Sequence, residues 1–182
     1  SDRGYGVSCT YDTSADRFLV MYSVDDSGAR YNSAIMGRVG TVTGGGTNSV
    51  AYGTATTIYD HAIDFTQSMS SCVTYATSAN RHVFVQNIYK YASDNSSDGA
   101  GTASITVEVT GGSTNTPSAG TYLLMDSGNQ GDSGGYSICW DETNDRLLMI
   151  QNNSSSKDFE YAIGSISGST ITWGSVTAWS YI

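Results

Sequence analysis

Charged residues, proline and long apolar runs are all scarce in this sequence. Asp, Glu, Lys and Arg account for 14% of the 182 residues, against about 25% in a typical soluble domain. Acidic residues outnumber basic ones by 17 to 8, which gives a formal net charge of −9. Nucleic-acid backbones and anionic lipid surfaces are bound mainly through Lys and Arg, so this balance argues against both kinds of partner. No apolar run approaches the ~20 residues of a membrane-spanning helix, which argues against membrane insertion.

Cysteine is also scarce, and no C-x-x-C pair occurs. The pattern therefore offers neither a disulfide framework nor a zinc site. We expect free thiols that pack as small buried apolar side chains. The three positions are Cys9, Cys72 and Cys139. We predict no metal and no cofactor; the one alternative is calcium at Asp25-Asp26, or at Asp94 with Asp98, because hard cations bind carboxylate oxygens.

One sequence pattern occurs three times. The copies read VSCTYDTSADRFLVMYS, SCVTYATSANRHVFVQN and YSICWDETNDRLLMIQN. Each contains an Arg directly after an acidic or amide residue, and an aromatic residue six positions before that Arg. The arginines are Arg17, Arg81 and Arg146, and the aromatic residues are Tyr11, Tyr75 and Trp140. Matched copies at almost constant spacing indicate a structural repeat.

Each copy begins with the pattern of a β-hairpin. Cys9 and Tyr11 stand on alternate positions, which predicts a strand with one buried face. A polar turn follows, and then a continuous apolar run that predicts a strand covered on both faces. His82 falls inside this run in the second copy, so we expect it in a strand. The aromatic residues at the repeated position are expected to pack in the core.

Two further strands complete each copy. The third begins at an Ala, and the fourth is clearest over 52–58 and 173–179. No window shows the i, i+3, i+4 apolar pattern of a helix. We therefore predict an all-β fold of three tandem four-stranded antiparallel units that resemble β-propeller blades, each ~60–65 residues long. The unit boundaries are 1–60, 61–125 and 126–182.

The repeat also resembles a known group of repeats. The motifs D-x-x-x-[DN]-R-x-[LV]-[MV] and A-I-x-G-x-[VI] … [YW]-G-[TS] are similar to the propeller-like repeats of bacteriophage tail-fibre and other virion structural proteins. The resemblance covers most of the first and third copies and about half of the second. It implies a role on a virion surface or in another extracellular assembly. We expect a non-enzymatic structural or adhesive protein there, with glycans as candidate ligands of its acidic loops. A purely architectural assembly subunit is an alternative.

Three blades do not close a ring, because propellers typically have four to eight. An open array leaves sheet edges and faces uncovered, which proteins seldom tolerate. We therefore expect self-association, or completion by other virion or surface subunits. The simpler alternative is that the three units pack as an ordinary β-sandwich or prism.

The segment GDSGG at 131–135 is identical to the nucleophile segment of chymotrypsin-like serine proteases. By that resemblance Ser133 would be the nucleophile and His61 the general base. Asp94 or Asp98 would orient the histidine. The surroundings argue against this: His61 lies in YDHA rather than AAHC, and it stands too close to Ser133 in sequence for the two barrels of that family. The repeat accounts for the segment as a loop between units, so we expect no enzyme and keep the protease as the alternative.

The loops after the second strand and between units are long, polar and acidic. In an antiparallel meander they emerge at the same end of the strands, and function concentrates on such loops. Carboxylates there could accept hydrogen bonds from sugar hydroxyls, while an aromatic ring stacks on the sugar. The candidate binding residues are Asp25, Asp26, Arg30, Tyr31, Asp60, Asp94, Asp98, Asp126, Asp132, Lys157 and Asp158.

The repeated arginines begin the second strand of each unit. We expect each to clamp its own turn, because a guanidinium fork readily bridges carboxylates and carbonyls. A ring of cation sites is the functional alternative.

Overall fold

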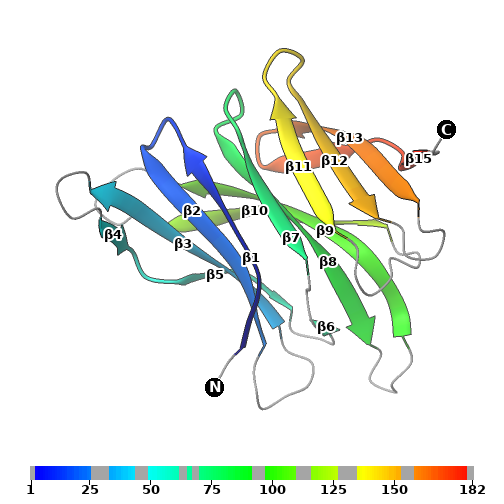
Figure 1. Ribbon diagram of the computed structural model, residues 1–182, viewed down its shortest axis with the longest axis horizontal. Helices are drawn as coiled ribbons and strands as arrows, with labels where there is room; N and C mark the ends of the chain where they lie inside the picture. The colour runs from blue at the N-terminus through cyan, green and yellow to red at the C-terminus, as the bar shows by residue number, and fades with distance from the viewer. Residues whose placement is uncertain are drawn as a thin grey trace.

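The computed structural model of the chain describes residues 3–25, 33–43, 49–61, 65–66, 70–91, 97–109, 116–126, 135–152 and 158–179 (Figure 1). These residues form three five-stranded antiparallel sheets and contain no helix. The all-β prediction is therefore confirmed. Since the described ranges hold no helix, they hold none that could cross a membrane.

Each sheet is built from consecutive strands. The first sheet contains β1 (Arg3–Asp12), β2 (Arg17–Asp25), β3 (Ser33–Thr43), β4 (Ser49–Tyr52) and β5 (Thr56–His61). The middle sheet contains β6 (Phe65–Thr66), β7 (Ser71–Ala76), β8 (Arg81–Tyr91), β9 (Ser97–Val109) and β10 (Pro117–Asp126). The last sheet contains β11 (Tyr136–Asp141), β12 (Arg146–Asn152), β13 (Phe159–Ser167), β14 (Thr170–Trp173) and β15 (Thr177–Trp179).

The first hairpin of each sheet has the same backbone shape. Four-residue turns are closed by the pairs Asp12–Arg17, Ala76–Arg81 and Asp141–Arg146. The last residue of each turn has a positive φ: 55° at Asp16, 49° at Asn80 and 52° at Asp145. Asp and Asn enter this left-handed region more readily than other residues with a side chain. The turn therefore accounts for the acidic or amide residue before each repeated Arg.

The number of strands per sheet differs from the prediction. In the first and last sheets, the segment predicted as one fourth strand is broken into two, and both pieces pair with the third strand. The break falls at Gly53 and at Gly174, where the glycine N–H donates to a carbonyl of the third strand at 2.8 Å. In the middle sheet β10 is unbroken, and the short strand β6 adds to β8. Each sheet thus has five strands rather than four.

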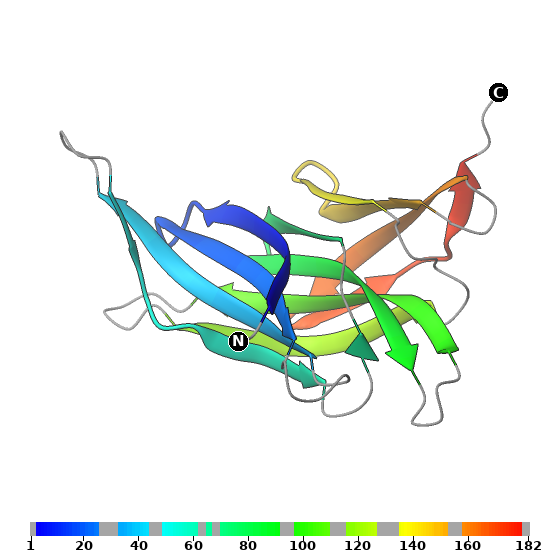
Figure 2. The ribbon, with the colours of Figure 1, turned by 60° about the horizontal axis from the view of Figure 1, so that its bottom comes forward.

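The sheets stack face to face, with the middle sheet between the other two (Figure 2). The first and middle sheets enclose one core that includes Leu19 and Phe84, both fully buried. The middle and last sheets enclose another, with Val83 and Leu147. Val83 and Phe84 are neighbours in β8 and point to opposite sides, so this strand is covered on both faces as predicted. The same prediction is wrong for β2 and β12, where buried and half-buried residues alternate and only one face is fully covered, because each of these strands has a described neighbouring sheet on one side only.

We call the face of a sheet that points toward the start of the stack its upstream face, and the opposite face its downstream face. The upstream face of the middle and last sheets packs on the preceding sheet. The first strands β1, β7 and β11 lie in neighbouring positions along the stack (Figure 1). Tyr75 lies on the upstream face of the middle sheet and Trp140 on that of the last. Tyr11 lies on the upstream face of the first sheet, which nothing in the described chain precedes. The downstream face of the last sheet is likewise uncovered, so the described stack is open at both ends.

Candidate functional site

Most of the predicted binding loops lie outside the described residues. This applies to Asp26, Arg30, Tyr31, Asp94, Asp132, Lys157 and the candidate nucleophile Ser133. Four further residues predicted in loops lie within strands: Asp25, Asp60, Asp98 and Asp126. The loop prediction is wrong for these four because backbone pairing carries the strands beyond their apolar side chains. The backbone of His61 ends β5, and Asp158 directly precedes β13.

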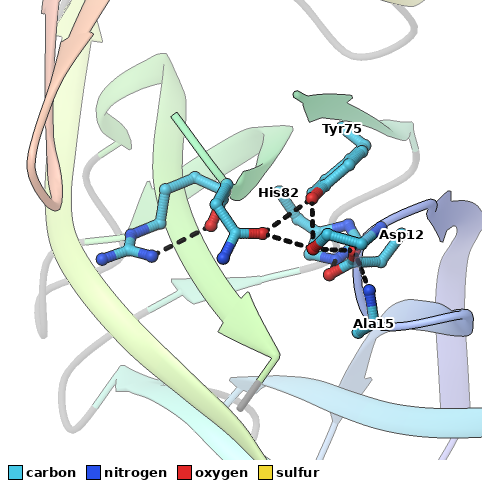
Figure 3. Close-up of polar contacts among 7 residues, drawn as sticks. Asp12, Ala15, Tyr75 and His82 are labelled. Carbon is cyan, nitrogen blue, oxygen red and sulfur yellow. Dashed lines mark hydrogen bonds and ion pairs between the residues drawn. The ribbon is translucent and has the colours of Figure 1, made fainter. Parts of the chain in front are cut away.

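A buried polar site joins the first turn to the middle sheet. Asp12 ends β1 and is 1% exposed. Its Oδ1 accepts hydrogen bonds from the backbone N–H of Ser14 at 2.9 Å and of Ala15 at 2.8 Å (Figure 3). Burial acts to raise the pKa of Asp12, but hydrogen bonds from Ala15 and Ser14 outweigh it and hold the pKa below its ordinary value. The carboxylate therefore stays ionised inside the seam, by which we mean the interface between two stacked sheets.

Ser14 links this turn to the middle sheet. Its Oγ lies 2.8 Å from Asp12 Oδ1, 2.9 Å from the Tyr75 hydroxyl and 2.8 Å from Asn80 Oδ1. The Tyr75 hydroxyl donates to the same Asn80 oxygen at 2.7 Å. Two consecutive turns of the repeat are thus tied together by one serine and one tyrosine.

His82 approaches Asp12 from β8 (Figure 3). Its Nε2 lies 3.4 Å from Asp12 Oδ2, and the side chain is 0% exposed. Burial lowers the pKa of His82 to about 4, although the nearby Asp12 carboxylate opposes the change. At neutral pH the pair is therefore a neutral imidazole beside a carboxylate. No described side chain lies within hydrogen-bonding geometry of either ring nitrogen.

The strand placement of His82 is confirmed, but the sequence reasoning missed its partner Asp12. A signal was available in the repeat alignment. His82 occupies the position held by Phe18 in the first copy and Leu147 in the third. A polar residue at a position otherwise filled by large apolar side chains needs a buried polar partner.

Further hydrogen bonds cross the two seams at repeated positions. Ser23 donates to Gln86 at 2.8 Å across the first seam. Thr102 donates to Gln151 at 2.7 Å across the second. Gln86 and Gln151 each stand five residues after the repeated Arg, so the same repeat position receives a hydroxyl from the preceding sheet in both seams.

The downstream face of the last sheet carries apolar side chains that are buried elsewhere in the repeat. Ile163 is 51% exposed, whereas its counterparts Val39 and Thr106 are 0% exposed. Leu148 and Ile150 are half-buried on the same face, while the residues in their places in β2 and β8 are fully buried. This face therefore has the apolar composition of a face that packs between two sheets, but no described sheet covers it.

The upstream face of the first sheet has the same character. Tyr11 is 42% exposed, although its counterpart Tyr75 is buried. Its ring contacts Phe18 with centroids 5.2 Å apart, and its hydroxyl donates to Asp16 just as that of Tyr75 donates to Asn80. The prediction that Tyr11 packs in the core is wrong, because no described sheet precedes it. Trp140, at the same repeat position, packs against the second core.

The prediction of buried cysteines is wrong at two of three positions. Cys9 and Cys139 are exposed and Cys72 is half-buried, and all three are free. Cys9 lies on the uncovered upstream face of the first sheet and Cys139 on the uncovered downstream face of the last. Cys72 packs against the second core, where burial raises the pKa of its thiol to about 12. A thiol with such a raised pKa is unreactive at neutral pH.

The repeated arginines contact their turns. Each donates to the carbonyl of the last turn residue: Arg17 to Asp16 at 2.8 Å, Arg81 to Asn80 at 2.9 Å and Arg146 to Asp145 at 2.9 Å. Arg81 also pairs with Glu108 of β9 at 3.1 Å. These are the contacts that a turn clamp requires.

Across the described ranges, no cluster of three His, Cys, Asp or Glu residues could hold a metal ion. Comparisons of the chain with protein-family models, curated proteins and solved structures found no match. The features that point to a function are therefore the two uncovered faces, which can bury apolar area against another sheet.

Proposed function

We propose that the chain is a non-enzymatic structural module, three blades of a propeller-like assembly whose uncovered faces are buried against further blades. The sequence motifs that resemble tail-fibre repeats support a virion or another extracellular surface as its proposed location. Its work is architectural: rigid sheets stack through repeated contacts and extend the array beyond one chain.

One observation carries this proposal. Every large apolar side chain that the structure describes as exposed belongs to an outer sheet. Five are on the first sheet and three on the last: Val7, Tyr11, Val42, Val50, Tyr52, Phe159, Ile163 and Trp179. Among the side chains whose exposure the structure describes, the middle sheet, which is covered on both sides, has none. Exposed apolar side chains gathered on one face of a sheet are typical of an interaction site.

The same observation favours assembly over an isolated sandwich. In an isolated sandwich the outward faces are expected to be polar. Here the outward faces repeat the apolar positions of the inward ones. Burying a large apolar side chain stabilises a structure by ~1.5–3 kcal/mol, so several such residues favour a stable contact.

Light scattering of a surface variant tests the proposal. Ile163→Arg places a charge in the centre of the uncovered downstream face and is expected to reduce the assembly to the mass of one chain. Ala119→Arg, on an exposed position of β10 in the middle sheet, is the matched control and should leave the assembly mass unchanged. Equal masses for both variants and the unmodified chain would contradict the proposal.

A further inference from the structure

We infer that a second copy of this chain covers both uncovered faces, with the downstream face of the last sheet of one copy packed on the upstream face of the first sheet of the other. This inference rests on the proposed function and names its partner. The chain already makes this contact twice: the first sheet packs its downstream face on the middle sheet, and the middle sheet does the same on the last. Because repeat positions keep their faces, the two uncovered faces are complementary surfaces.

The turns supply the first contact across the new seam. In the first internal seam Ser14 reaches the Tyr75 hydroxyl at 2.9 Å. At the uncovered faces these two repeat positions are held by Thr143 and Tyr11. Both chemical groups are retained, a turn hydroxyl and a phenol. We therefore expect Thr143 of one copy to contact Tyr11 of the other.

A second contact involves a buried polar atom. Asn152 Oδ1 is shielded from solvent and has no hydrogen-bond partner among the described residues, a condition that costs ~1–3 kcal/mol. Asn152 occupies the repeat position of Ser23, which bonds to Gln86 across the first seam at 2.8 Å. The position of Gln86 is taken in the first sheet by Tyr22. The repeat register therefore places Tyr22 of the second copy beside Asn152, where a turn of the Asn152 side chain toward the new seam would let its Oδ1 accept from the Tyr22 hydroxyl.

The new seam lacks the histidine of the buried Asp12–His82 pair. Asp141 and Phe18 take the places of Asp12 and His82. Asp141 Oδ1 already accepts the backbone N–H of Thr143 at 2.9 Å, so its own turn satisfies the carboxylate. The new seam therefore needs no partner for Asp141, and it contains no imidazole to protonate.

Two is the copy number that fits three blades per chain. A ring of identical three-blade chains must contain a multiple of three blades. Propellers typically have four to eight blades, and six is the only multiple of three in that range. Two copies related by a two-fold axis would form two identical seams and leave no face uncovered.

The two exposed cysteines provide the test. Cys9 and Cys139 hold the repeat positions of Val73 and Thr10, which lie on the neighbouring strands β7 and β1 and face the shared seam. The seam would therefore bring Cys139 of one copy near Cys9 of the other. A short bismaleimide cross-linker is applied to Cys9→Ser chains, to Cys139→Ser chains and to an equimolar mixture of the two.

The expected result is a covalent dimer in the mixture and none in either variant alone, because each variant keeps only one of the two thiols. The unmodified chain should give a covalent dimer and nothing larger, and the Cys9→Ser/Cys139→Ser double variant should give no product. Cross-linking within a single variant, or none in the mixture, would overturn the seam, and larger covalent species would overturn the two-copy ring. If cross-linking fails but the mass of the unmodified chain in solution still exceeds that of one chain, this seam alone is refuted. If that mass is the mass of one chain, the proposed function is refuted as well.

Discussion

Replacing His82 by leucine is expected to remove most of the acid sensitivity of the fold between pH 6.5 and 4. Burial lowers the pKa of His82 from 6.5 to about 4 in the folded chain. In that window the unfolded chain therefore binds a proton that the folded chain does not, and stability falls as the pH falls. The difference corresponds to on the order of 3 kcal/mol lost by pH 4.

Leucine is the matched replacement, because Leu147 occupies the same repeat position in the last sheet and is fully buried. Asp12 keeps its hydrogen bonds to Ser14 and Ala15 in the variant. The free energy of unfolding is measured by urea titration at pH 7.5, 5.5 and 4.0 and at one fixed protein concentration, since association would otherwise shift the apparent stability. His61→Gln, at the only other histidine, is the control.

The unmodified chain and His61→Gln should lose stability between pH 6.5 and 4, and His82→Leu should lose much less. Protonation of carboxylates lowers the stability of both proteins at the acid end, so the informative quantity is the difference in stability between the variants. Equal pH dependence of the unmodified chain and His82→Leu would refute the burial of a neutral imidazole beside Asp12.

Three further predictions concern packing, the first seam and catalysis. Gly164→Ala would place a Cβ 2.6 Å from the ring of Trp173 and is expected to lower the free energy of unfolding by ~1–3 kcal/mol, whereas Gly135→Ala has open space and should change it by less than ~0.5 kcal/mol; equal effects in urea titrations would contradict the fold. Tyr75→Phe removes the hydroxyl that joins two turns and should cost ~1 kcal/mol in the same assay; an unchanged midpoint would show that this hydroxyl contributes nothing. A fluorophosphonate probe is expected to leave the chain unlabelled, and labelling that Ser133→Ala abolishes would revive the protease alternative.

Local features of the fold were predictable where the repeat fixes them. The Asp or Asn before each Arg indicates a tight turn, and the structure has a positive φ at Asp16, Asn80 and Asp145. The broken fourth strand was not predictable, because it depends on glycine N–H groups that bond back to the third strand. A single copy of the pattern contains no information on that pairing.

The burial of residues in the two outer sheets could not be predicted from the sequence either. Cys9 and Tyr11 have the alternation of a buried face, and their counterparts in later copies pack against a neighbouring sheet. Whether a repeated position is buried depends on how many sheets stand beside it, and alternation reports only which positions share a face. The identity of Asp12 as the partner of His82 likewise depends on which sheets lie next to one another, which the repeat pattern does not state.

Sedimentation equilibrium of the unmodified chain at neutral pH tests the central claim most directly. If the apolar outer faces of the first and last sheets cover one another between two copies, the mass should be twice the 19.2 kDa of one chain. A mass of 19.2 kDa at every concentration up to the solubility limit would contradict the account.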